Sequence, residues 1–126
     1  MITFVESKPA RENHLQLLNQ SHSNWTLERK EAALLAFLNS QYAACAYDED
    51  RLIGTVRVLS DRVGFGLIAD LLVHPDYRRQ GIASTLLDMC EKRFSGFHLY
   101  AEAGSKEAQK LYNKRSYKSI EIFKKE

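Results

Sequence analysis

The chain contains 126 residues, 44% of them hydrophobic and 27% charged, with a formal net charge of +2. This length predicts a single domain over residues 1–126 that buries about two thirds of its unfolded surface and folds without disulfides. The small net charge gives no support for nucleic-acid binding, and neither a signal peptide nor an apolar run near the ~20 residues of a membrane span is visible.

The first third of the chain predicts one strand followed by two helices. Ile2–Val5 alternates weakly between apolar and polar side chains and is the expected first strand. Pro9 precedes a helix over residues 10–20, since a proline at the start of a helix costs no hydrogen bond. Thr26 is a good N-cap for a second helix that runs to about Leu38.

The next segments predict a β-hairpin that leads into a buried central strand. Tyr42–Tyr47 and Leu52–Leu59 flank a tight charged turn, and Gly54 indicates a bend or bulge in the second of these strands. The apolar run from residue 66 to residue 73 has the length and content of a buried strand, and only Asp70 breaks it.

A short basic loop joins this central strand to an amphipathic helix. The loop contains Arg78, Arg79 and Gly81, and apolar side chains recur at helical spacing from residue 80 onward. The free N–H groups of a helix's first turn and the helix dipole both attract an anion placed in such a loop. Gly81 lets a phosphate approach the backbone closely, and the arginines add positive charge. The sequence therefore predicts a phosphate site, although it lacks both the dinucleotide fingerprint G-x-G-x-x-G and a nucleotide P-loop.

The rest of the chain predicts a strand, a helix and a last strand. Phe97–Glu102 is the next strand, Ser105 caps a short helix, and Tyr117–Phe123 is the final strand. The complete predicted order is β-α-α-β-β-β-α-β-α-β, with no repeat and no linker long enough to separate domains.

The cysteine and histidine residues give no indication of a metal site. Cys45 and Cys90 lie in apolar patterns without metal-ligand spacing, which predicts reduced, buried thiols and a cytoplasmic protein. His74 and His98 have no ligand-spaced partners and are interpreted as structural or exposed. We therefore expect no metal cofactor.

The basic loop resembles the acetyl-CoA motif of the GNAT superfamily of N-acetyltransferases. That motif reads Arg/Gln-x-x-Gly-x-Gly/Ala, and Arg78, Gly81 and Ala83 fill it. The family's usual lead-in V-x-P-x-Y-R is also present, as Val73, Pro75, Tyr77 and Arg78.

A second stretch, residues 108–117, is similar to the family pattern N-x-x-A-x-x-L-Y-x-K-x-G-F. It matches at Ala108, Leu111, Tyr112 and Lys114, and conservatively at Tyr117. The predicted order of elements resembles the family topology over most of the chain. The resemblance implies an α/β GNAT fold, with a mixed central sheet of about six strands that splays apart between strands 4 and 5.

The chain also departs from the family pattern. Ser105 stands where the family usually has Asn, although Ser can still cap the helix. Ser116 replaces a Gly that commonly adopts positive φ, at a cost of about 1 kcal/mol if that backbone is kept. The sequence stops where most members add another strand, and the resulting open sheet edge suits pairing with a second copy in a homodimer.

The resemblance implies that acetyl-CoA binds as a cosubstrate where the central strand and the following strand splay apart. Backbone N–H groups there would hold the pantetheine arm and polarise the thioester carbonyl, and the loop backbone would take the pyrophosphate. The residues expected to bind acetyl-CoA are Leu71, Leu72, Val73, Arg78, Arg79, Gln80, Gly81, Ile82, Ala83, Ser84 and Ser105.

Three residues are candidates for catalysis. Tyr112 matches the family's general acid, which protonates the departing thiolate; the alternative is an ordinary core tyrosine. Asp70 and Glu102 could bind the charge of the amine or relay its proton. The structural alternative for Asp70 is a bond to backbone or to Arg57, and for Glu102 a solvated strand end.

The acceptor implied by the resemblance is a primary amine of a small molecule, which attacks the thioester directly in a ternary complex. His22 and Trp25 lie in the segment that generally shapes the acceptor pocket in the family. Two alternatives stay open: a non-catalytic module that binds acetyl-CoA and regulates a partner, and an enzyme that acetylates protein amines. The sequence does not distinguish polyamines, amino sugars, amino acids and arylalkylamines as acceptors.

Overall fold

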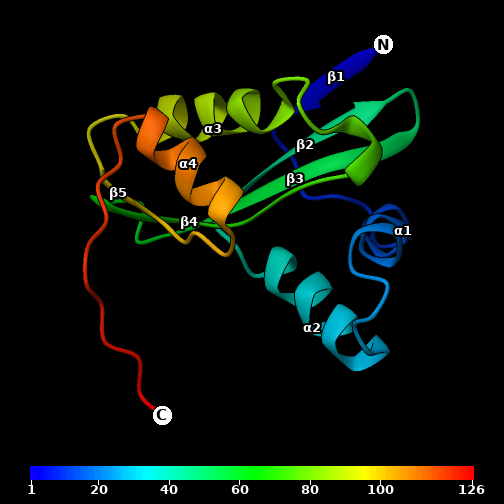
Figure 1. The fold of residues 1–126 in the computed structure, drawn as a ribbon, viewed down its shortest axis with the longest axis horizontal. Helices are drawn as coiled ribbons and strands as arrows, with labels where there is room; N and C mark the ends of the chain where they lie inside the picture. The colour runs from blue at the N-terminus through cyan, green and yellow to red at the C-terminus, as the bar shows by residue number, and fades with distance from the viewer.

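The computed structural model describes residues 1–126 and shows an α/β/α arrangement, with helices on both faces of one sheet (Figure 1). The strands are β1 (Ile2–Val5), β2 (Tyr42–Asp48), β3 (Arg51–Ser60), β4 (Phe65–Val73) and β5 (His98–Ala101). The helices are α1 (Arg11–Ser21), α2 (Leu27–Leu38), α3 (Ile82–Arg93) and α4 (Lys106–Lys114), with a 3₁₀ turn at Pro75–Tyr77. The predicted α/β fold is confirmed.

The sheet order is β1-β2-β3-β4-β5, the same as the order along the chain. The first three pairings are antiparallel, whereas β4 and β5 are parallel because α3 carries the chain back across the sheet. Strand β3 has an extra residue, Ile53, beside Gly54, which confirms the bulge predicted there.

One face of the sheet, here called the α3 face, is covered by α3 and α4 (Figure 1). It carries a core of 13 buried residues that joins Val56 and Ile68 of the sheet to Leu86 of α3 and Tyr112 of α4. A Cβ at Gly54 would lie 3.3 Å from Leu86 Cδ1, so the missing side chain lets α3 lie close to β3. This layer is a continuous apolar core.

The opposite face, here called the α1 face, is covered by α1 and α2 (Figure 1). Its buried apolar cluster has three members, Leu17 of α1 with Cys45 and Leu52 of the sheet. His14 is also buried on α1, and its ring meets Phe37 of α2 edge-on with centroids 4.5 Å apart. The α1 face therefore combines a small apolar core with buried polar groups.

The sixth predicted strand is wrong. Residues 117–123 form no strand, and the chain leaves the sheet along an irregular path (Figure 1). The side chains of Ile120, Ile122 and Phe123 are exposed, so the alternation of this segment buries nothing. Alternation is a local preference, whereas a strand also needs pairing and burial, and β5 offers an edge of only four residues. The homodimer predicted from the open edge stays a prediction.

Local signals in the sequence are mostly confirmed. Thr26 and Ser105 cap α2 and α4 by accepting hydrogen bonds from the N–H groups of Arg29 and Ala108 (both 3.1 Å). Ser116 keeps the left-handed backbone expected there, with φ at +71°. Cys45 and Cys90 are free and buried, as predicted. None of the helices is long and apolar enough to cross a membrane.

Candidate functional site

The N-terminus of α3 is built differently from those of α2 and α4. No side chain caps α3, and its first turn has no acidic residue, whereas the other two helices have capping side chains and an acid in the first turn. The N–H groups of Ile82, Ala83 and Ser84 therefore remain free for a ligand. The positive end of the helix dipole is not neutralised here, so this turn can bind an anion.

The loop before α3 wraps around this free turn. Arg79 and Gly81 both have left-handed backbone, with φ of +65° and +77°. A Cβ at Gly81 would meet no atom within 4 Å, so the space in front of the loop is open. Arg78 and Arg79 are exposed and form none of the ion pairs of the chain. The loop thus presents free amides and free positive charge, which fits a pyrophosphate.

Two side chains hold this loop from behind. His74 is buried, and its Nδ1 accepts a hydrogen bond from the Asp76 N–H at 3.0 Å. Its Nε2 lies 2.9 Å from Arg51 Nη2 and 3.0 Å from Gln20 Oε1, which ties the loop to β3 and to α1. The hydroxyl of Tyr77 donates to Asp48 Oδ2 at 2.5 Å. The lead-in residues of the motif therefore fix the backbone that carries the arginines.

The predicted splay between the fourth and fifth strands is confirmed. β5 pairs with β4 only from Phe65 to Ile68, and the N–H of Glu102 closes the ladder on the Ile68 carbonyl at 2.9 Å. On that side, residues 69–73 of β4 have no strand partner. Backbone groups alternate sides along a strand, so those N–H and C=O groups of Leu71, Leu72 and Val73 that point away from β3 lie free beside the loop, as an extended pantetheine arm requires.

Asp70 lies at a bulge in this free part of β4. The pairing register shifts between Thr55 and Arg57 of β3, so that Asp70 and Leu71 oppose a single β3 residue. Asp70 has left-handed backbone with φ at +52°. The bulge interrupts the β3–β4 hydrogen bonds just after the last β4 residue that pairs with β5. The carboxylate of Asp70 points toward Arg57, on the α1 face.

The carboxylate of Asp70 is held by an ion pair. Arg57 Nε donates to Asp70 Oδ2 at 2.5 Å, and Arg57 also donates to Ser40 Oγ at 3.3 Å. The structural alternative stated for Asp70, a bond to Arg57, is therefore present. The Asp70 side chain is still 44% exposed, so a ligand can reach it as well.

Tyr112 on α4 is buried, and its hydroxyl has no hydrogen-bond partner. Burial, helped by the charges of Cys90, Glu102 and Glu91, raises the pKa of Tyr112 to about 12. The phenol is therefore protonated at neutral pH and can donate a hydrogen bond. An orphaned hydroxyl in a core costs free energy, so this group fits a site that a ligand completes.

Glu102 and Ser105 flank the entrance to α4. Glu102 is exposed directly after β5, and its charge helps to raise the pKa of Tyr112. Ser105 uses its oxygen as acceptor for the Ala108 N–H, and its hydroxyl hydrogen and second lone pair remain for a ligand.

Trp25 lies in a stack that covers both of its faces. The His22 ring is parallel to it within 5° at a centroid distance of 4.0 Å, and the Arg29 guanidinium carbon also lies 4.0 Å from the ring centroid. Two groups at this distance cannot share one face, so the indole is sandwiched. Trp25 therefore offers an acceptor only its edge, which limits the binding role predicted for it.

His22 follows α1 directly and is partly exposed. Burial chiefly lowers its pKa, the charges of Arg29 and Arg78 lower it further, and the charge of Asp70 opposes them. Its described ring contact is the stack on Trp25. The acceptor-binding role expected of His22 stays a prediction.

Sequence reasoning missed His14. It is 2% exposed, burial lowers its pKa to about 4, and the charge of Asp70 acts on it in the opposite direction. A signal existed, because His14, Leu17 and Leu18 fall on one face of α1 and all three are buried. No group of three or more His, Cys, Asp or Glu side chains with metal-binding geometry occurs in the chain.

Comparisons with known proteins agree with this geometry. The chain matches the model of the acetyltransferase (GNAT) family over residues 8–117. No curated protein matches it. A probable acetyltransferase from meticillin-resistant Staphylococcus aureus has 24% identity and a TM-score of 0.78, with 100% of each chain covered.

Two further solved structures have the same fold. A GNAT family acetyltransferase from Streptococcus pneumoniae has 24% identity and a TM-score of 0.78, over 99% of this chain and 98% of that one. AAC(6′)-Iy, in complex with the bisubstrate analogue CoA-S-monomethyl-acetylneamine, has 15% identity and a TM-score of 0.74, over 100% of this chain and 98% of that one. Likeness at these identities establishes the fold.

Proposed function

Because the chain belongs to the GNAT family of acetyltransferases, we propose that it transfers an acetyl group from acetyl-CoA to a primary amine of a small molecule. The observation that carries the proposal is the buried hydroxyl of Tyr112, which has no partner in the chain. A module that only binds acetyl-CoA needs no proton donor at this position, whereas a transferase needs one for the departing thiolate.

The uncapped turn of α3 and the free backbone of β4 are the groups that would hold acetyl-CoA. The amides of Ile82, Ala83 and Ser84 would bind the pyrophosphate, helped by Arg78 and Arg79. When bound, acetyl-CoA supplies the acetyl group already activated as a thioester. In AAC(6′)-Iy the same fold holds a single molecule that combines CoA with an amine, acetylneamine, which supports an amine acceptor here.

The acceptor would enter between Asp70 and His22. The exposed carboxylate of Asp70 can attract an ammonium group, and Glu102 offers a second exposed carboxylate. Either carboxylate could relay the proton that the amine must lose before it attacks. Tyr112, protonated at neutral pH, would donate its proton on the opposite side of the reaction. Holding both reactants together supplies much of the rate.

The test is a thiol-release assay with acetyl-CoA and a panel of amines: a polyamine, an amino sugar, an amino acid, an arylalkylamine and a lysine peptide. We expect turnover on one small-molecule class, and a fall in kcat of about a hundredfold in Tyr112→Phe. Calorimetry should show unchanged acetyl-CoA binding, because the phenyl ring preserves the packing.

Tyr117→Phe is the matched control. Its ring packs against Tyr112 with centroids 5.2 Å apart, but its hydroxyl is engaged by Glu91 at 2.9 Å. This variant should keep kcat within a few-fold of the wild type. Equal rates in wild type and Tyr112→Phe would make Tyr112 a core residue only. Binding without turnover on any amine would support the non-catalytic module, and turnover on the peptide alone would support protein acetylation.

A further inference from the structure

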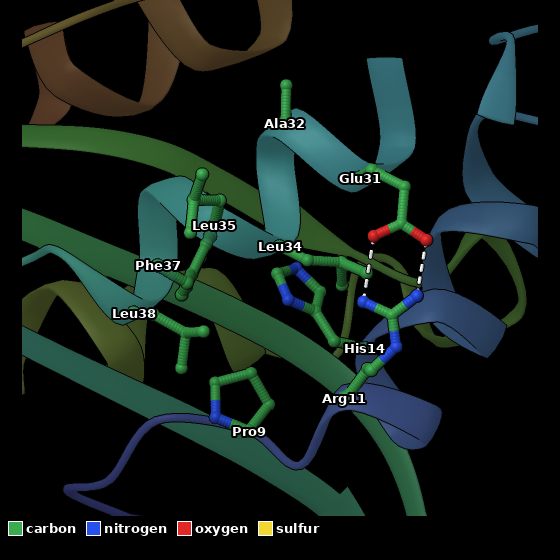
Figure 2. A pocket seen from close by; sticks show the side chains of 9 residues that line it. All are labelled: Pro9, Arg11, His14, Glu31, Ala32, Leu34, Leu35, Phe37 and Leu38. Carbon is green, nitrogen blue, oxygen red and sulfur yellow. Dashed lines mark hydrogen bonds and ion pairs between the residues drawn. The ribbon is translucent and has the colours of Figure 1, made fainter. Parts of the chain in front are cut away.

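A pocket of about 300 Å³ lies between the start of α1 and the end of α2, on the outer side of the α1 face. Figure 2 shows the side chains that line it, with those of Leu34, Leu35 and Leu38 contributed by α2 and Pro9 by the segment before α1. Its volume is at the lower end of the range for small-molecule sites and about twice that of a cavity that binds benzene. It can hold one small ring system.

The pocket has no net charge. Its only charged residues, Arg11 and Glu31, face each other across the gap between the helices and form a two-point ion pair (Figure 2). Burial lowers the pKa of His14 to about 4, so its imidazole is neutral at neutral pH. An uncharged ligand therefore fits this pocket better than an ion does.

His14 gives the pocket one specific polar contact. The residue is 2% exposed and extends from α1 toward α2 in the pocket wall (Figure 2). Its ring meets Phe37 edge-on. Its nitrogens form no side-chain hydrogen bond, and they are not among the fully enclosed polar atoms without a partner, so a small polar group can reach them. A neutral imidazole has one donor and one acceptor, and a buried polar group normally has a partner. A ligand with a hydrogen-bonding group could supply that partner.

One residue that lines the pocket, Phe37, is linked to the candidate active site through Arg57. Phe37 lines the pocket, and its ring centroid is 6.0 Å from the guanidinium carbon of Arg57. Arg57 in turn donates to Asp70 at 2.5 Å. The charge of Asp70 also acts on His14. Two side chains in series, Phe37 and Arg57, therefore separate a molecule in the pocket from the carboxylate at the β4 bulge.

We propose that this pocket is a second ligand site, separate from the acyl-transfer cleft, for a small uncharged aromatic molecule with one hydrogen-bonding group. The molecule packs between the two helices and hydrogen-bonds to the free imidazole of His14. Because the Arg57 guanidinium lies over the ring of Phe37, binding of the molecule shifts the Arg57–Asp70 pair. The proposal concerns binding and does not depend on which amine, if any, the protein acetylates.

The experiment uses indole and 1-methylindole, which differ in the N–H that His14 would accept. Spectra of the ¹⁵N-labelled full chain are recorded during titration with each compound. Indole should shift the amide signals of the pocket residues and the Nε–H signal of Arg57. Its Kd should be about three- to tenfold lower than that of 1-methylindole, the difference that one hydrogen bond makes.

Three variants test where and how the probes bind. His14→Phe keeps an aromatic ring and should reduce the ratio of the two Kd values to near one. Ala32→Phe fills the pocket from an exposed helical position and should abolish binding of both probes. Gln16→Phe, exposed on α1 outside the pocket, should bind both as the wild type does. Thermal melts confirm that each variant is folded.

The proposal is overturned by any of three results. Indole could leave the signals of the pocket residues unshifted, it could bind folded Ala32→Phe as well as the wild type, or both probes could bind the wild type equally. Each of these would mean that the space between α1 and α2 is not the site described.

Discussion

The two faces of the sheet differ in how they are filled. The α3 face has a core of 13 buried residues, whereas the buried apolar cluster of the α1 face has three. The α1 face instead buries His14 and holds Arg57 and Ser40 in a polar chain that ends at Asp70. One layer of the protein is a packed apolar core, and the other is a small core with polar groups and a pocket.

The two faces also carry different candidate functional groups. The uncapped turn that suits a pyrophosphate starts α3, and Tyr112 is fixed within the same core by α4. Groups that could choose an acceptor, His22 and Asp70, face the other layer. A packed apolar face suits the binding of a fixed cosubstrate, and a polar face with a pocket suits the proposed acceptor, because function can vary on one fold.

Truncating one leucine in each core tests the comparison most directly. Leu86 of α3 and Leu17 of α1 are both fully buried. We expect Leu86→Ala to lower the free energy of unfolding by about 4 kcal/mol and Leu17→Ala by about 3 kcal/mol, because a cavity collapses more easily in the smaller cluster. Urea unfolding at neutral pH measures both. A larger loss for Leu17→Ala would contradict the contrast between the two faces.

A negative charge at the start of α3 should weaken acetyl-CoA binding. In Gly81→Glu the new carboxylate stands beside the free amides, so we expect Kd from calorimetry to rise about a hundredfold. Gly96→Glu is the matched control, since Gly96 also has positive φ, at +86°, and open space around its Cα. The control shares the backbone strain and should keep its affinity. A folded Gly81→Glu with unchanged Kd would refute the pyrophosphate site.

The sequence predicted most of the scaffold because its signals are local. Caps at Thr26 and Ser105, the helical spacing after Gly81 and the alternation of the hairpin strands are each decided within a few residues. The strand predicted over residues 117–123 was wrong. Its apolar side chains alternate, but the segment pairs with no other strand and no layer of the protein covers it.

The candidate site was predictable where a motif marks it and not where tertiary contacts make it. The glycine-containing loop before α3 and the place of Tyr112 on α4 follow from short patterns, and their roles stay predictions. The stack that covers Trp25, the bulge at Asp70 and the burial of His14 depend on contacts between segments far apart in the chain. Such contacts change what a residue can do without changing its sequence neighbourhood.

The smallest expected effect concerns the acid stability of the α1 face. His14 has a pKa of about 4 in the folded protein because burial disfavours its charged form, against the ordinary value of 6.5. Between these values the unfolded chain binds more protons than the folded one. The contribution of His14 is therefore complete above pH 6.5 and is lost as the pH falls toward 4. It amounts to about 2 kcal/mol between pH 7.5 and pH 5.

The measurement is the free energy of urea unfolding at these two pH values for the wild type, His14→Phe and His98→Phe. His98 is exposed, so His98→Phe should lose as much stability on acidification as the wild type does. His14→Phe should lose about 2 kcal/mol less than either, because it has no imidazole to protonate on unfolding. An equal loss in all three would mean that water reaches His14 freely. The α1 face would then bury no polar ring, and the contrast with the α3 face would be one of core size alone.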